Sequence, residues 1–213
     1  MHLASVNVAT PRMVELSGRR HRTAIEKVAT VRSVKVGPGG LAGDRVASTK
    51  HHGGPDQAVY AYAVEDYAWW SSELGRELVP ATFGENLTIA GIESASLFIG
   101  DRLRIGADVV LEVTSPRIPC ATLSARIGDA GFVRRFAAAG RPGPYLRVIS
   151  VGALRSGDAV VLDTSHRSHV ALMVLSELFY DRKAPAHRLE DVLHAPIAIR
   201  ARVDVEERLS ALR

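Results

Sequence analysis

Residues 100–120, GDRLRIGADVVLEVTSPRIPC, join two predicted strands to a cysteine framed by prolines. The pair Gly100-Asp101 is typical of a tight turn that leads into a strand. Residues 101–105 and 109–114 are rich in β-branched and other apolar side chains, which predicts two short strands with a turn between them. The segment ends in Ser115-Pro116-Arg117-Ile118-Pro119-Cys120, where the prolines fix φ and favour extended backbone before them.

The same alternation of short strands and glycine-rich turns extends over residues 1–163, which predicts a barrel or a sandwich. Apolar residues at helical spacing interrupt the strands at residues 64–74, 120–127 and 132–139. The other predicted strands are residues 3–8, 24–29, 31–36, 57–63, 145–151 and 159–162.

From residue 165 onward the pattern is helical only. Helices are predicted at residues 169–179 and 203–212, with a third around residues 189–193 that ends at Ala195-Pro196. Three short helices bury little area by themselves, so we expect them to dock on the barrel or to pair between subunits in a homodimer. The sequence therefore predicts a mainly β, α+β fold with domains at residues 1–163 and 165–213.

Composition limits the classes of protein to consider. Of the 213 residues, 46% are hydrophobic and 23% are charged, which is usual for a globular protein. We find no run of about 20 apolar residues and no secretory signal, so we expect a cytoplasmic protein without a membrane span. The net charge is +4, but the basic residues are dispersed and no nucleic-acid-binding motif is present, so we do not expect a nucleic-acid partner.

Cys120 is the one cysteine in the sequence. It cannot form an internal disulfide, and it cannot hold a zinc ion or an iron–sulfur cluster without other ligands. Three roles stay open: a buried inert thiol, a nucleophile, or one soft ligand to a metal that brings its remaining ligands.

Three further segments are more constrained than folding alone requires: residues 40–45 (GLAGDR), 51–59 (HHGGPDQAV) and 83–88 (FGENLT). A zinc site built from His51 or His52 with Asp56 is one interpretation, but adjacent histidines point in opposite directions in extended backbone and no further ligands follow at a usual zinc spacing. The motifs of serine hydrolases, P-loop proteins and dinucleotide-binding proteins are absent from the sequence.

Together, the ordered motifs resemble those of the MOSC domain family, named for the C-terminal domain of molybdenum cofactor sulfurase. The match covers most of residues 20–163, and the helical tail is similar to that of a bacterial branch that confers resistance to 6-N-hydroxylaminopurine. The matching motifs are Gly43-Asp44, His52-Gly53-Gly54-Pro55-Asp56, Tyr67-x-x-Trp70, Gly84-Glu85-Asn86-Leu87, Gly100-Asp101, Pro116-Arg117-x-Pro119-Cys120 and Gly157-Asp158.

The resemblance implies a β-rich barrel that binds the molybdenum cofactor (Mo-molybdopterin), with Cys120 as molybdenum ligand or sulfur carrier. A metal held by a pterin dithiolene needs only one further soft thiolate from the protein. The cofactor phosphate needs cations, and Lys27, Arg45, His52 and Arg117 are the candidates. On this interpretation Asn86 donates a hydrogen bond to the pterin edge, while Glu85 and Asp56 accept from pterin N–H groups or orient an arginine; Gly53 and Gly84 complete the set of candidate cofactor-binding residues.

The function implied is reduction of small N-hydroxylated compounds, such as N-hydroxylaminopurines, to amines. Two rivals stay open: a sulfur carrier that delivers a persulfide from Cys120, and a non-enzymatic module that binds the cofactor. The eukaryotic amidoxime-reducing relatives carry an additional N-terminal β domain, for which this chain has no room. Because the chain shows no electron relay of its own, we expect an external donor such as a flavoprotein reductase.

Overall fold

The computed structural model describes residues 1–16, 18–49 and 52–212. A curved sheet of eight strands occupies the centre, with strand order β13-β9-β10-β11-β7-β8-β1-β4. Its strands are β1 (His2–Val8), β4 (Val28–Ala29), β7 (Val59–Ala63), β8 (Leu87–Ala90), β9 (Arg102–Ile105), β10 (Val109–Pro116), β11 (Pro144–Ser150) and β13 (Val160–Asp163).

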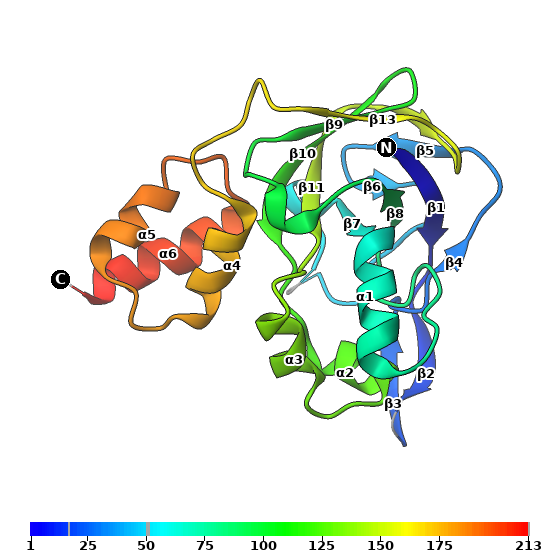
Figure 1. Ribbon diagram of the computed structural model, residues 1–213, viewed down its shortest axis with the longest axis horizontal. Coiled ribbons are helices and arrows are strands. Elements are labelled where there is room, and N and C mark those ends of the chain that lie inside the picture. The colour runs from blue at the N-terminus through cyan, green and yellow to red at the C-terminus, as the bar shows by residue number, and fades with distance from the viewer. Residues whose placement is uncertain (17, 50–51, 213) are drawn as a thin grey trace.

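The eight-stranded sheet curls until its edge strand meets β1. His2 and Ala159 form an antiparallel bridge. Backbone hydrogen bonds run from Leu3 N to Asp158 O (2.9 Å) and from Val160 N to Met1 O (3.0 Å). The α+β fold predicted from the sequence is therefore present, and the curled sheet has the character of the predicted barrel (Figure 1).

Helix α1 (Val64–Leu74) connects the two strands of the one parallel pair among the described strand pairs. Strands β7 and β8 run parallel, and α1 provides the crossover between them. The helix has the predicted bounds: Glu65 and Asp66 lie in its first turn, and Gly75 ends it in the left-handed conformation (φ 62°).

The remaining elements are arranged around the sheet. Two 3₁₀ turns, η1 (Pro55–Gln57) and η2 (Ser94–Ser96), lie in loops. A three-stranded sheet contains β12 (Gly152–Leu154), β5 (Val34–Gly37) and β6 (Gly40–Leu41), and a hairpin contains β2 (Arg12–Leu16) and β3 (Arg19–Thr23). The helices other than α1 are α2 (Ala121–Ile127), α3 (Phe132–Ala138), α4 (Leu172–Tyr180), α5 (Ala186–Val192) and α6 (Ile199–Ala211).

The sequence prediction was wrong near the β2–β3 hairpin. Residues 24–29 were predicted as one strand, but within that range only Val28–Ala29 forms a strand, and a further strand lies earlier, at Arg19–Thr23. Strand β3 is rich in arginine, and among the described strands it pairs only with β2. Its sequence therefore lacks the alternation of apolar and polar residues that predicts a strand. Strand β8 was also not predicted as a strand.

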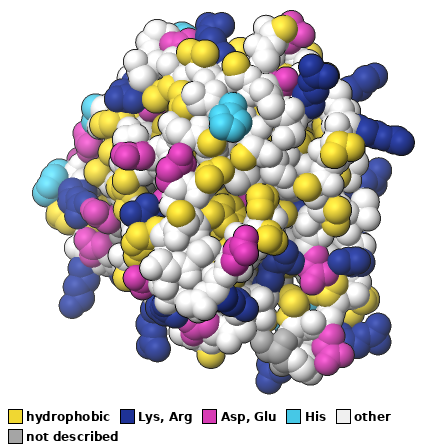
Figure 2. All heavy atoms as spheres, turned by 45° about the vertical axis from the view of Figure 1, so that its right-hand side comes forward, with side chains coloured by type: hydrophobic (Ala, Val, Ile, Leu, Met, Phe, Trp, Pro, Cys, Tyr) yellow, Lys and Arg dark blue, Asp and Glu magenta, His cyan; other side chains and the backbone are white. Residues whose placement is uncertain are grey.

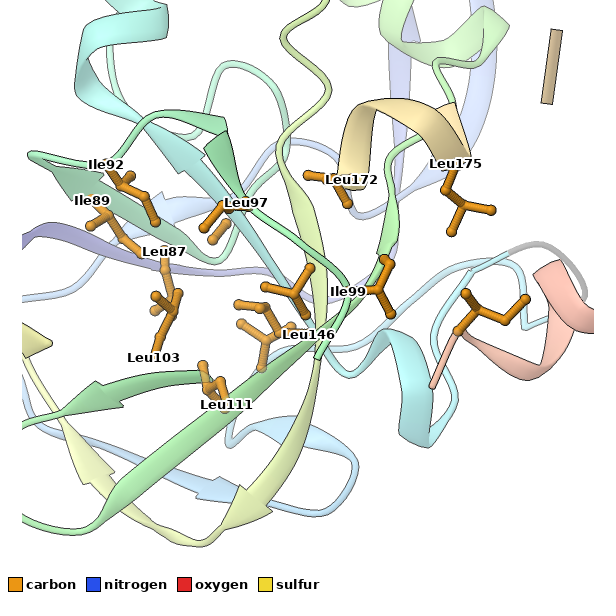
Figure 3. Packing of buried hydrophobic residues seen from close by; sticks show 14 of the residues in the cluster. Leu87, Ile89, Ile92, Leu97, Ile99, Leu103, Leu111, Leu146, Leu172 and Leu175 are labelled. Carbon is orange, nitrogen blue, oxygen red and sulfur yellow. The ribbon is translucent and has the colours of Figure 1, made fainter. Parts of the chain in front are cut away.

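Two apolar clusters form the core. The larger one fills the curled sheet and continues without a break into helices α4, α5 and α6. Figure 3 shows Leu103, Leu111 and Leu146 of the sheet in one interior, with Leu172 and Leu175 of α4 nearby. The smaller cluster is aromatic and packs α1, α2 and α3 together through Trp70, Phe83, Phe132 and Phe136, among others.

The C-terminal helices dock on the sheet, as one of the two sequence alternatives predicted. Leu172 N donates to Leu97 O (2.8 Å) and Ile99 N donates to Val170 O (2.9 Å), so the start of α4 is joined to the loop before β9. The division into domains at residues 1–163 and 165–213 stays a prediction, because one apolar cluster crosses it. None of the described helices is long and apolar enough to cross a membrane.

The docking can be tested with a matched pair of leucine variants. Leu172 is fully buried against the sheet, whereas Leu212 is 59% exposed. Leu172→Ala should lower the free energy of unfolding by about 2–5 kcal/mol, because it removes buried methyl groups and leaves a cavity. Leu212→Ala should change it by less than about 0.5 kcal/mol. Urea denaturation measures both, and equal small losses would show that α4 does not dock.

Candidate functional site

Cys120 lies where the longest strand ends and a helix begins. Strand β10 ends at Pro116, and Cys120 is the residue that precedes the first turn of α2. Its backbone is extended (φ −126°, ψ 167°), and its carbonyl oxygen accepts from Leu123 N (3.0 Å) and Ser124 N (3.1 Å). The proline-framed turn predicted from the sequence therefore fixes the thiol at a defined junction in the fold.

The thiol opens into a cavity that collects residues from distant parts of the chain. Eight of the ten residues predicted from the sequence line this cavity, and Asp56 and Glu85 do not. The eight are Lys27, Arg45, His52, Gly53, Gly84, Asn86, Arg117 and Cys120. The four motif segments thus meet at one place, although Asp44 and Cys120, the two members that lie furthest apart in the sequence, are 76 positions apart.

The surroundings of Cys120 favour the thiolate. Burial alone would raise the pKa of Cys120, but a hydrogen bond with His52, the positive charge of Arg117 and the N–H of Leu123 together lower it to about 6. The thiol is partly exposed to the cavity. A thiol with this pKa is mostly deprotonated at neutral pH, which is the form that binds metals and attacks electrophiles.

Arg117 is a buried cation that lies close to Cys120 and two tyrosines. Its exposed fraction is 5%, and among the described residues no acceptor reaches its Nε and no carboxylate forms an ion pair with it. Its guanidinium lies 4.9 Å from the ring centroid of Tyr60 and is hydrogen-bonded to the hydroxyl of Tyr145. Burial of an unpaired charge is costly, so this arrangement calls for an anion in the cavity.

Lys27 and Asn86 are joined through a residue that was not among the predicted site residues. Asp44 Oδ1 accepts from Lys27 Nζ and from Ala9 N (2.8 Å), and Asp44 Oδ2 accepts from Asn86 Nδ2 (2.9 Å). Asn86 Nδ2 also donates to Asn7 O (3.3 Å), so both of its amide hydrogens are used inside the protein. Asn86 therefore fixes the backbone here and has no hydrogen left for the pterin contact expected from the sequence.

The cavity carries a net positive charge. Its described lining contains four Lys or Arg residues (Arg22, Lys27, Arg45 and Arg117), one carboxylate (Asp44) and the Cys120 thiolate, so its formal charge is +2 with His52 neutral. Arg22 and Arg45 are exposed, and Arg22 Nη1 donates to Ala47 O (3.3 Å). Elsewhere the basic side chains are dispersed among acidic ones, as Figure 2 shows for one face.

The carboxylates of Asp56 and Glu85 bind other groups of the protein outside the cavity. Asp56 pairs with Arg147 (3.1 Å), which agrees with the alternative that it orients an arginine. Glu85 is fully buried, and its Oε1 accepts from Tyr67 Oη, Ala81 N and Thr88 Oγ1, each at 2.7 Å. Neither residue lines the cavity, so neither carboxylate is placed to contact a ligand bound there.

Several cavity residues were missed by the sequence analysis. Arg22, Asp44, Tyr60, Thr122 and Tyr145 all line the cavity. Asp44 belongs to the Gly43-Asp44 motif, so the sequence could have identified it as a site residue. Tyr60 and Tyr145 lie on strands whose sequence pattern predicts only core packing. His51, the other candidate in the zinc interpretation, lies outside the described residues. Within residues 1–16, 18–49 and 52–212, no group of three His, Cys, Asp or Glu side chains is placed to hold a metal.

The electrostatics of Cys120 can be tested on the protein without any ligand. Iodoacetamide alkylation at a series of pH values should give a midpoint near pH 6 for the wild type, because the thiolate is the reacting form. His52→Ala removes a hydrogen bond that stabilises the thiolate, so the midpoint should rise. His187→Ala, an exposed histidine on α5, is the control and should leave it unchanged. A midpoint near the usual value of about 8.5 in the wild type would refute this description of the site.

Comparison with known proteins places the chain in a family. A family model described as "MOSC domain" matches residues 48–161. The protein YflK of Bacillus subtilis is 31% identical over 189 residues, which cover 89% of this chain and 85% of YflK. A protein of Gibberella moniliformis named "Reductase" is 35% identical over 126 residues, which are 58% of this chain but only 22% of that protein.

A solved structure supports the fold. The crystal structure of YiiM from Geobacillus stearothermophilus superimposes with a TM-score of 0.81 at 24% identity and covers 98% of each chain. The likeness extends through the C-terminal helices as well as the curled sheet. With a family model that spans more than half of its length and a relative that aligns along most of it, this chain belongs to the MOSC domain family.

Proposed function

We propose that this protein binds the molybdenum cofactor in the cavity at Cys120 and reduces small N-hydroxylated compounds, such as N-hydroxylaminopurines, to amines. The observation that carries the proposal is that one cavity holds both the Cys120 thiol, whose pKa is lowered, and the buried Arg117, which has no carboxylate partner among the described residues. Membership of the MOSC family, whose domains are associated with this cofactor, and a relative named "Reductase" support it.

The residues present fit such a group. A metal whose other ligands come from a pterin dithiolene needs one soft donor from the protein, and the cavity offers one thiol held close to its thiolate form. The cofactor phosphate is an anion, and the unpaired guanidinium of Arg117 together with the exposed Arg22 and Arg45 gives the cavity the matching charge.

The chain's own residues have distinct parts in this scheme. Cys120 binds the metal through Sγ, and His52 keeps that sulfur deprotonated through its hydrogen bond. Arg117 holds an anionic group of the cofactor, with its orientation fixed by the Tyr60 ring. Lys27, Asp44 and Asn86 join three chain segments into the cavity wall. When bound, the cofactor supplies two-electron oxygen-atom transfer.

The reaction needs a partner. Reduction of R–NH–OH to R–NH₂ consumes two electrons and two protons and releases water. The single cysteine in the sequence cannot hold an iron–sulfur cluster, so we propose an external donor, such as a flavoprotein reductase. The part of the Gibberella protein that matches this chain is 22% of its length, so the name "Reductase" describes a much longer polypeptide than this fold alone.

The sulfur-carrier rival uses the same thiolate. A cysteine with a lowered pKa is also suited to carry a persulfide, and that role needs no bound cofactor. The sulfane-sulfur and pterin content of the purified protein distinguishes the two functions. A carrier should contain sulfane sulfur on Cys120 and little pterin, whereas the proposed enzyme should contain stoichiometric pterin. A module that only stores the cofactor would contain the pterin but show no turnover with an artificial reductant.

The activity test uses variants of the thiol. With dithionite-reduced viologen as donor, the cofactor-loaded wild type should reduce an N-hydroxylated purine, and with NADPH alone it should not. Cys120→Ala and Cys120→Ser should lose nearly all of this activity, because serine replaces a soft ligand with a hard one. Circular dichroism checks that both variants fold. If Cys120→Ala kept most of the wild-type rate, the thiol would be neither a ligand nor a carrier.

Arg117 is tested through cofactor content rather than activity. Loss of a hydrogen-bonded cation from a buried anion costs about 2–5 kcal/mol, so Arg117→Ala should purify with far less pterin than the wild type. Arg117→Lys should recover part of it, because a point charge replaces a planar fork. Arg134→Ala, an exposed arginine on α3, serves as the control. Equal pterin content in all four proteins would remove Arg117 from the site.

A further inference from the structure

The hairpin of β2 and β3 carries most of the excess positive charge of the chain. Residues 12–23 contain four arginines and one glutamate, so their net charge is +3, whereas the whole chain carries +4. Arg12 pairs with Glu26 (2.6 Å). In the described part of the chain no ion pair holds the other three arginines of the hairpin, which are exposed: Arg19, Arg20 and Arg22. Basic residues outside the hairpin are thus nearly balanced by acidic ones, and those of the hairpin are not.

This hairpin is anchored beside the cavity that holds Cys120. Strand β3 leads directly into the cavity wall, because residues 22–25 are among the lining residues. On one face of the hairpin, Val14 and Leu16 pack into the aromatic cluster of the core. Strand β2 also contacts α2, the helix that follows Cys120 (Figure 1). The unpaired arginines therefore lie at the edge of the candidate site.

Arg20 and Arg22 share the outer face of the hairpin with an apolar side chain. Met13 lies directly opposite Arg22 in the strand register, and Glu15 lies opposite Arg20. Side chains at opposite positions, and at alternate positions along a strand, point to the same face. Met13 is exposed on this face, next to the arginine that reaches the cavity.

The neighbouring part of the cavity lining has the same character. Arg45 is exposed and forms no ion pair with any described residue, and Val46 is an exposed apolar side chain. We define the basic face by these side chains together: Met13, Arg20, Arg22, Arg45 and Val46. Arginine and methionine are enriched in protein–protein interfaces, and a positive face selects a partner with a negative one. The basic face therefore fits a protein with an acidic surface.

We propose that the basic face is the docking surface for the electron-donor protein, and that this donor is acidic around its redox group. The proposal rests on the function proposed above and deepens it, since it states where the partner binds and by which chemistry. For each R–NH–OH that becomes R–NH₂ and water, the partner loses two electrons and solvent supplies two protons. A donor on this face has its redox group beside the cavity. Arg19 and Arg20 do not line the cavity, so they attract the donor without contacting a ligand inside.

The test measures binding of a purified flavodoxin, a small acidic flavoprotein, by isothermal titration calorimetry at low ionic strength. Arg19→Gln/Arg20→Gln should weaken the wild-type affinity about three- to tenfold, because the attraction of two exposed charges is lost. In about 1 M salt, where the Debye length is about 3 Å, the variant and the wild type should bind equally weakly. Arg19→Lys/Arg20→Lys keeps the charge and should retain most of the affinity.

The matched control is Arg155→Gln/Arg182→Gln, which removes the same charge elsewhere. Each of these side chains is 71% exposed, and they follow β12 and α4, away from the hairpin (Figure 1). The control should bind flavodoxin nearly as the wild type does. The proposal would be wrong if the folded wild type did not bind flavodoxin at low ionic strength, or if the control lost as much affinity as the hairpin variant.

Other anionic partners are tested on the same proteins, because arginines also bind phosphate groups. The probes are a short DNA duplex and vesicles that contain an anionic phospholipid. We expect the Arg19→Gln/Arg20→Gln change to matter for flavodoxin. If it lowered binding of DNA or vesicles and left flavodoxin binding unchanged, the basic face would be a site for nucleic acid or lipid, and the proposal would be overturned.

Turnover separates the docking surface from the proposed function. In the cofactor-loaded protein, Arg19→Gln/Arg20→Gln should keep the wild-type rate with reduced viologen and should show a higher KM for reduced flavodoxin. An unchanged KM for flavodoxin would contradict the docking surface. If the wild type showed no turnover with viologen, the proposed function would fail, while the binding measurements, which need no turnover, would still decide whether the basic face binds an acidic protein.

Discussion

The unpaired charge of Arg117 is the constraint around which the site is organised. An ionised side chain buried without a partner destabilises a fold by several kcal/mol, and Arg117 is 95% buried with no carboxylate paired to it in the described part of the chain. The nearby thiolate of Cys120 offsets part of that cost, and each group stabilises the charged form of the other. An anion bound in the cavity would offset the rest of the cost of burying the Arg117 charge. For this reason we interpret the cavity as a binding site.

The rest of the fold places this pair. Strand β10 is the longest of the sheet and delivers Arg117 and Cys120 at its end, where Arg117 N donates to Gly143 O (3.1 Å). The loops after β6 and before β8 then bring Asp44 and Asn86 to the same end of the sheet. Arg200 of α6 donates to Gly53 O (2.7 Å) and so joins the C-terminal helices to the loop that carries His52. A site shared by so many segments cannot form unless the sheet curls and the helices dock.

Much of this could be predicted from the sequence, for physical reasons. The helical spacing of its apolar residues predicts helix α1, and a glycine follows its last residue, so its bounds were predicted correctly. Eight of the ten predicted site residues do line one cavity, because turns with special backbone needs leave glycine and proline at fixed places in the motifs, as in residues 52–55 and 116–119. By contrast, hydrogen-bond partners are set by tertiary packing. The local sequence does not show that the amide hydrogens of Asn86 bind Asp44 and Asn7. It also does not show that Glu85 accepts a hydrogen bond from the buried Tyr67.

The most direct test of the account is the molybdenum and pterin content of the protein purified from a molybdenum-replete host. Metal analysis gives the molybdenum, and fluorescence after oxidation gives the pterin. The account predicts close to one molybdenum and one pterin per chain, with Cys120 resistant to alkylation until the cofactor is removed. Folded protein that contains neither, and whose thiol is freely alkylated as purified, would contradict it.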